Sequence, residues 1–63
     1  MRFEFLDEKY QYCATVDDEG DFFLHENQAA VVWFEPDQAL KLLAFLQKHE
    51  AFLREQQEKR HGH

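Results

Sequence analysis

The chain has 63 residues and a formal net charge of −6. A chain of this length forms one domain and buries only about 60% of the surface that it exposes when unfolded. The negative charge argues against the phosphate backbone of a nucleic acid as its partner. A single cysteine, Cys13, excludes an internal disulfide. Oligomerisation is then the ordinary way in which so small a fold gains stability.

Four short segments have the pattern of strands, over residues 1–6, 10–16, 22–25 and 29–34. In the first two, alternating side chains indicate strands with one buried face. The fourth, AAVVWF, is continuously apolar, which is typical of a strand covered on both faces. The run 17–21, DDEGD, is the clearest turn, because Gly20 can adopt a positive φ. The order predicts an antiparallel meander.

Residues 36–59 read as one long amphipathic helix, followed by a frayed tail over 60–63. Pro36 suits the first helical position, and Asp37 places a negative charge in the first turn, where the helix dipole favours it. The helix would span roughly 36 Å and overhang strands of about 20 Å. The predicted fold class is α+β: a four-stranded antiparallel β-meander packed by one long C-terminal α-helix (ββββα), in a single domain over 1–63.

The apolar surface of this helix is wider than one sheet needs. Beyond the main stripe of leucines, Phe45 and Phe52 lie on a flank with His49 between them. Either the sheet curls to cover these rings, or a second copy of the helix packs on them. We expect the second arrangement, a homodimer. Its predicted self-association interface consists of Leu42, Phe45, His49, Phe52 and Leu53.

Both faces of the meander also carry large apolar side chains, since Phe22 and Leu24 point opposite to Phe23. One helix covers one face only, and an exposed apolar face marks an interaction site. Most of the acidic residues fall at predicted turns, whereas five of the seven basic residues lie in the helical stretch from Pro36 to Arg60. The residues proposed to meet a partner form an aromatic or acidic surface: Phe23, Trp33, Asp17, Asp18, Glu19 and Asp21.

The sequence offers little for catalysis or metal binding. It has no serine, and Cys13 would form a thiolate–imidazole pair with His25 only if adjacent strands brought the two together. The acidic turn lacks the spacing of an EF-hand, and neither glycine fits a phosphate-binding loop. The terminal run 61–63, HGH, reads equally as a weak ligand pair for a transition ion and as a remnant of an added tag. We expect no enzymatic activity, no cofactor and no metal.

The ββββα order resembles that of the PC4-like and Pur-type domains, which dimerise and bind single-stranded nucleic acids. The resemblance is one of topology. Sheets of that kind need basic residues near their aromatics, and the strands here offer only Arg2, with Lys9 in a turn. No signal peptide or membrane-spanning run is recognised, so a soluble cytoplasmic protein is expected.

These patterns predict a small, acidic, non-enzymatic homodimer that binds another protein, whose identity and cellular role the sequence leaves open. A nucleic-acid-binding module, or an acidic mimic of nucleic acid, is the alternative.

Overall fold

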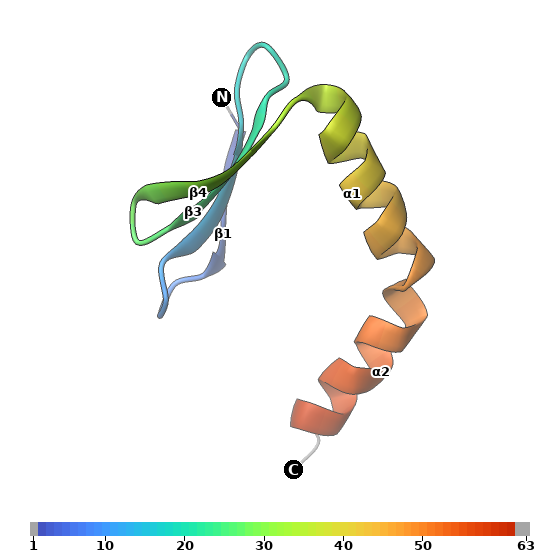
Figure 1. Ribbon diagram of the computed structural model, residues 1–63. Coiled ribbons are helices and arrows are strands. Elements are labelled where there is room, and N and C mark those ends of the chain that lie inside the picture. The colour runs from blue at the N-terminus through green and yellow to red at the C-terminus, as the bar shows by residue number, and fades with distance from the viewer. Residues whose placement is uncertain (1, 62–63) are drawn as a thin grey trace.

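The computed structural model describes residues 2–61 (Figure 1). Its elements are β1 (Arg2–Asp7), β2 (Tyr12–Val16), β3 (Phe22–Glu26), β4 (Ala29–Phe34), α1 (Pro36–Lys48) and α2 (Glu50–His61). The strands form one antiparallel sheet in the order β1-β2-β3-β4. The predicted α+β class and meander are therefore confirmed, and the predicted strand bounds differ from the observed ones by no more than two residues.

The prediction of one uninterrupted helix was wrong, because the helix breaks at His49. This residue has φ −108° and ψ 13°. Its N–H donates to the Leu46 carbonyl at 3.2 Å, an i−3 bond that tightens the last turn of α1. Helical bonding resumes where the Leu53 N–H donates to the His49 carbonyl at 3.0 Å. Neither proline nor glycine stands at the break, so the helix propensities of the residues do not predict it.

The predicted tail is also partly helical. α2 continues to His61, which extends it beyond the predicted end of the helix at residue 59. Met1 and residues 62–63 lie outside the described residues, so the HGH run is described only at its first residue.

The β2–β3 turn is held by the Asp17 carboxylate. Its Oδ1 accepts hydrogen bonds from the backbone N–H groups of Glu19 at 3.0 Å and Asp21 at 2.9 Å. Gly20 has φ +88°, a conformation that L side chains rarely adopt. A Cβ placed at Gly20 would lie 3.1 Å from Pro36 Cγ. This turn therefore packs closely against the first residue of α1.

The other two turns rely on polar side chains and positive φ angles. In the β1–β2 turn, Asp7 Oδ1 accepts from the Lys9 N–H at 2.8 Å and from the Tyr10 N–H at 3.2 Å. In the β3–β4 hairpin, Asn27 has φ +51° and Gln28 has φ +73°. Positive φ at both central residues is the pattern of a type I′ turn, which matches the twist of the flanking strands.

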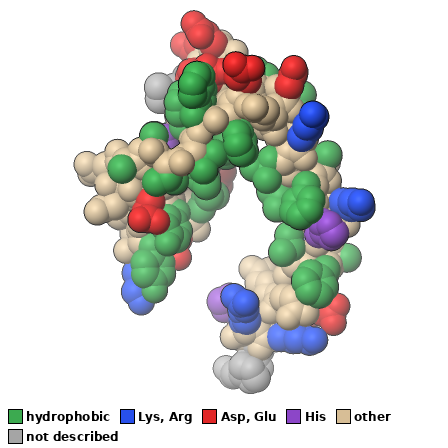
Figure 2. Space-filling view, in the orientation of Figure 1, with side chains coloured by type: hydrophobic (Ala, Val, Ile, Leu, Met, Phe, Trp, Pro, Cys, Tyr) green, Lys and Arg blue, Asp and Glu red, His purple; other side chains and the backbone are tan. Residues whose placement is uncertain are grey.

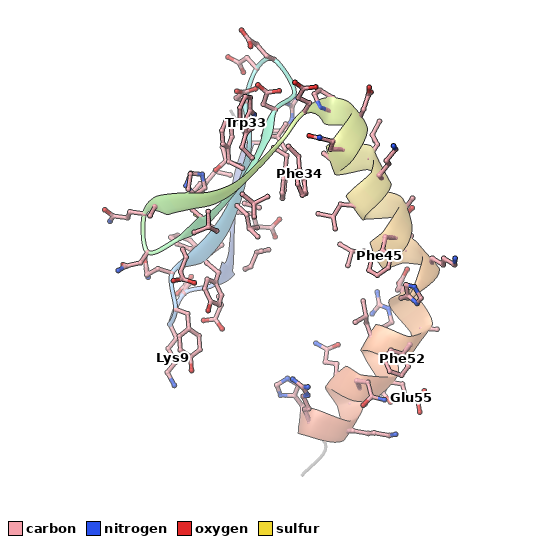
Figure 3. The ribbon with its side chains drawn as sticks, in the orientation of Figure 1. Lys9, Trp33, Phe34, Phe45, Phe52 and Glu55 are labelled. Carbon is pink, nitrogen blue, oxygen red and sulfur yellow. The ribbon has the colours of Figure 1, made fainter. Side chains whose placement is uncertain are left out.

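The strand register sorts the side chains onto two faces. Phe3 pairs with Thr15, Phe5 with Cys13, and Phe23 with both Thr15 and Trp33 across the sheet. We call this side the groove face: Phe3, Phe5, Cys13, Thr15, Phe23, His25 and Trp33. The opposite side, turned toward the helices, is the inner face, and its apolar part consists of Ala14, Val16, Phe22, Leu24, Val32 and Phe34. In Figure 3, Trp33 and Phe34 point to opposite sides of β4.

The two helices form an arm, residues 36–61, that does not lie across the sheet. The arm leaves the end of β4, bends at His49 and stands off from the strands (Figure 1). No residue of α1 or α2 is buried. The expectation of a helix packed on its own sheet is not met within one chain. The backbone N–H of Glu35 fixes the start of the arm by donating to Gln38 Oε1 at 3.0 Å.

A compact hydrophobic core is missing from the part of the chain that is described. Of residues 2–61, only Cys13 and Thr15 are buried, at 8% and 6% exposure. β4 is an edge strand whose Trp33 is 62% exposed, so the prediction that this strand is covered on both faces is wrong for the single chain. The Cα radius of gyration is 13.5 Å. A compact domain of this length would have a value of about 10.6 Å.

Candidate protein interface

An open apolar groove of 570 Å³ runs over the groove face. Its floor contains the two buried residues, Cys13 and Thr15, because β2 lies between β1 and β3. Phe3 and Phe5 stand along one side with their rings edge-to-face at 5.1 Å. None of the residues that line the groove is Asp, Glu, Lys or Arg: Phe3, Phe5, Gln11, Cys13, Thr15, Phe23, His25, Gln28 and Ala30. This lining suits an apolar occupant.

The alternation of residue types within β2 does not predict that the groove face is the better-covered side of this strand. It assigns Tyr12, Ala14 and Val16 to the apolar side of the strand, with Cys13 and Thr15 opposite them. The structure makes the second pair the best-covered side chains of the sheet. The neighbouring strands contained the information that was needed. Their register places Phe3, Phe5 and Phe23 on the same face of the sheet as Cys13 and Thr15.

The predicted aromatic partner residues meet on the groove face. The rings of Phe23 and Trp33 stack with centroids 6.4 Å apart and an interplanar angle of 8°. Trp33 also lines a shallow recess with Glu35 and Gln38 where β4 leads into α1. An exposed Trp ring bordered by a carboxylate favours contact with apolar groups that carry positive charge nearby.

The predicted acidic residues lie at the same end of the sheet. β3 begins at Phe22, directly after the DDEGD turn, so this turn lies next to the Phe23–Trp33 pair. Figure 2 shows acidic side chains gathered at this end of the molecule. The Asp17 carboxylate binds the turn's own backbone N–H groups, which assigns it a structural part in addition to its charge. Glu19 is exposed, and Asp18 is exposed as well.

The register brings Cys13 opposite His25, the adjacency that a thiolate–imidazole pair requires. Cys13 is buried at the floor of the groove and His25 lies at its side, half-buried. The His25 ring contacts Phe23, with centroids 6.2 Å apart.

The predicted self-association residues lie along the arm. Phe45, Phe52 and Leu53 are 59%, 60% and 48% exposed. The Phe45 and His49 rings are in contact, with centroids 4.8 Å apart. Phe45 and Phe52 lie on the arm well away from the strands (Figure 3). The strands of the same chain therefore do not enclose these rings. Other leucines of the arm are exposed as well: Leu40, Leu43 and Leu46.

An open hollow separates the arm from the inner face. Figure 2 shows hydrophobic side chains on both sides of this hollow. On the sheet side, the Phe22 and Phe34 rings stack with centroids 6.0 Å apart, and every apolar residue of the inner face is only half-buried. On the arm side, the leucine stripe of α1 and α2 has no buried member. Two apolar surfaces thus face each other across the hollow and converge where the arm leaves β4.

No protein-family profile, curated protein sequence or solved structure matches the chain. Within residues 2–61, no helix is both long enough and apolar enough to cross a bilayer. Across the same residues, His, Cys, Asp and Glu side chains do not gather in groups of three or more that could hold a metal ion.

Proposed function

We propose that this protein is a small, non-enzymatic homodimer that serves as a protein–protein interaction module. The observation that carries the proposal is the large surface area that a single chain exposes to water. The chain exposes 5743 Å². A compact monomer of the same mass exposes about 4,300 Å². The excess is roughly 1,400 Å² per chain. Within residues 2–61, thirteen large hydrophobic residues are 39–63% exposed.

This excess is of the size that a stable dimer buries. Specific interfaces of standard size cover about 800 Å² per partner, and obligate dimers cover more and are more apolar. A second copy could therefore remove the whole excess in one association step. Burial at about 25 cal/mol per Å² of apolar surface would supply the stability that the open single chain lacks.

The groove face supplies the module's second contact surface. It is apolar and aromatic, its lining contains no Asp, Glu, Lys or Arg, and the acidic turn stands at its end. The sheet half of the chain, residues 2–35, holds nine acidic and two basic residues and so carries a net charge of −7. This combination favours a protein segment with apolar anchor residues and basic flanks.

Light scattering coupled to gel filtration tests the homodimer. The native chain should elute with twice the mass of one chain. Phe45→Asp with Phe52→Asp should give monomer or unfolded chain, because an unpaired charge is costly to bury. Gln47→Glu with Arg54→Gln is the matched control: it changes the net charge equally and at the same seven-residue spacing. Each of these exposed residues follows a phenylalanine by two positions and so lies on the opposite side of its helix. A native chain that is a well-folded monomer, or a Phe double variant that keeps the dimer, would contradict the proposal.

Single-stranded nucleic acid is the second candidate, and the stack of exposed Trp33 on half-buried Phe23 is the observation that favours it. Bases stack on such pairs. The groove lining, however, offers no Lys or Arg to a phosphate backbone. A fluorescent oligonucleotide titrated at low salt separates the candidates, since electrostatic binding is strongest there. If the native chain binds the oligonucleotide and Trp33→Ala abolishes this binding, the nucleic-acid function is supported. If the native chain does not bind, direct binding is excluded, and mimicry of nucleic acid is what remains of this candidate.

A further inference from the structure

We infer that the two copies exchange arms, so that the arm of one chain fills the hollow between the inner face and the arm of its partner. This inference rests on the proposed homodimer and specifies its contacts. The occupant of the hollow is therefore a segment of the same sequence. Three independent features of the chain support it: apolar complementarity, the division of charge, and the dimensions of the two elements.

The apolar surfaces match in kind and in extent. The inner face offers the stacked Phe22 and Phe34 rings together with Leu24 and Val32, all half-buried. The arm has a stripe of leucines on one side and the Phe45–Phe52 flank on the next. An arm seated in the hollow would meet a sheet with its stripe and the partner's arm with its flank. The unusual width of the apolar surface on the arm then has a physical reason.

The charges are divided between the same two elements. The sheet half carries −7, whereas the arm, residues 36–61, holds five basic and four acidic residues and so carries +1. The last turn of α2 contains Lys59, Arg60 and His61. Two sheet halves brought together would repel each other, while an arm approaching a sheet half would be attracted. The electrostatics therefore favour an arm on a sheet over a sheet on a sheet.

The lengths agree as well. α1 has 13 residues, which at 1.5 Å per residue is about 20 Å. Strands of five or six residues are about 17–20 Å long. One helix of the arm is thus as long as one strand, so the leucine stripe can cover the sheet while the Phe45–Phe52 flank meets the second arm. A two-fold axis relating the copies gives each arm the same environment and closes the assembly at two chains.

Mixing two complementary variants tests the exchange. One variant carries Leu46→Glu and Leu53→Glu on the arm stripe, and the other carries Leu24→Glu on the inner face. Each alone should elute as monomer, because every arm–sheet contact in its dimer is spoiled. Their mixture should elute as a heterodimer, since the intact arm of the second variant can reach the intact inner face of the first. The control arm variant, Lys48→Glu, should remain a dimer on its own.

The possible results separate the two proposals. A native chain that is monomeric overturns the homodimer and the exchange together. Dimers formed by each variant alone overturn the exchange and leave the homodimer standing. Monomers that do not complement each other, with the sheet and helix content of the native chain retained, show that each arm folds onto its own sheet and likewise overturn the exchange.

Disulfide trapping decides the matter where the variants fail to fold. In a Cys13→Ala background, one chain carries Val32→Cys on the inner face and another carries Leu46→Cys on the arm. Oxidation of the mixture should give a linked pair on a denaturing gel, well above the yield with Lys48→Cys in place of Leu46→Cys. The double variant Val32→Cys with Leu46→Cys should give dimer mass. A product of single-chain mass from that double variant would overturn the exchange.

Discussion

Gly20 lies in the β2–β3 turn of the sheet and packs against Pro36, the first residue of the arm. Its φ of +88° is strained for any L side chain, and the space around it is closed by Pro36. The Asp17 carboxylate holds the same turn through two backbone N–H groups. The turn therefore fixes where the arm starts, even though the arm stands off from the sheet along most of its length.

Replacing Gly20 with alanine should destabilise the protein by about 1–2 kcal/mol, because the new Cβ combines a disfavoured φ with a 3.1 Å approach to Pro36 Cγ. Urea denaturation followed by circular dichroism measures the effect. The neighbouring change Glu19→Ala, at an exposed site, should stay within about 0.5 kcal/mol. Equal stability of Gly20→Ala and native protein would show that this turn relaxes freely.

Gln28 offers the opposite case, a residue that is locally unfavourable. It has φ +73° in a two-residue hairpin where glycine is the preferred residue. Gln28→Gly should therefore stabilise the protein by about 0.5–1 kcal/mol. Thermal unfolding of Gln28→Gly and Gln28→Ala side by side provides the check, since alanine keeps the steric cost. A loss of stability with glycine would mean that the Gln28 side chain, which lines the groove, contributes more than its backbone costs.

At the scale of the elements, the arm is a pair of helices with few stabilising contacts of their own. Its ion pairs, Arg54 with Glu50 at 2.8 Å and Lys59 with Glu55 at 3.5 Å, join side chains that are 55–71% exposed. Pairs of this kind contribute little, because water screens them and long side chains lose freedom in forming them. Helices in proteins gain most of their stability from packing an apolar face. The arm therefore needs a surface to pack on.

Arg54→Ala should accordingly change the free energy of unfolding by less than about 0.5 kcal/mol. The measurement is denaturant unfolding at low and at high salt, and the two values should agree closely. Leu53→Ala, one residue earlier, should cost about 2 kcal/mol or more if the stripe is buried in the assembly. If the arginine change proved the more damaging of the two, the arm would depend on its charges and not on its leucines.

At the scale of the whole molecule, an extended shape and a large exposed surface belong together. The chain measures 40 × 27 × 17 Å along its principal axes, and its sheet and arm each present apolar side chains to the hollow between them. A chain that folds only when such surfaces are shared couples folding to association. Its stability then depends on its own concentration.

The midpoint of thermal unfolding should therefore rise with protein concentration. For a dimer that unfolds to two chains, a hundredfold rise in concentration adds about 2.7 kcal/mol per dimer. Circular dichroism across two decades of concentration measures the shift. The Phe45→Asp, Phe52→Asp variant, where it folds at all, should show no dependence. A native midpoint that is constant across this range would oppose coupled folding and association.

The sequence by itself determined the local structure. Alternation predicted the first two strands, short apolar runs predicted the other two, DDEGD predicted the central turn, and Pro36 predicted the start of the helical region. These features depend on residues close to one another in the chain. The excess of apolar side chains also follows from the sequence alone, since it comes from counting them against the area of one small sheet.

Only the tertiary structure decided where those side chains lie. The break at His49 has no signal in proline or glycine, and the side of β2 that becomes best covered is set by the phenyl rings of β1 and β3. The separation of arm and sheet likewise depends on how two distant surfaces meet. Such features arise from long-range packing, where many weak contacts outweigh local preference, and a local pattern does not encode them.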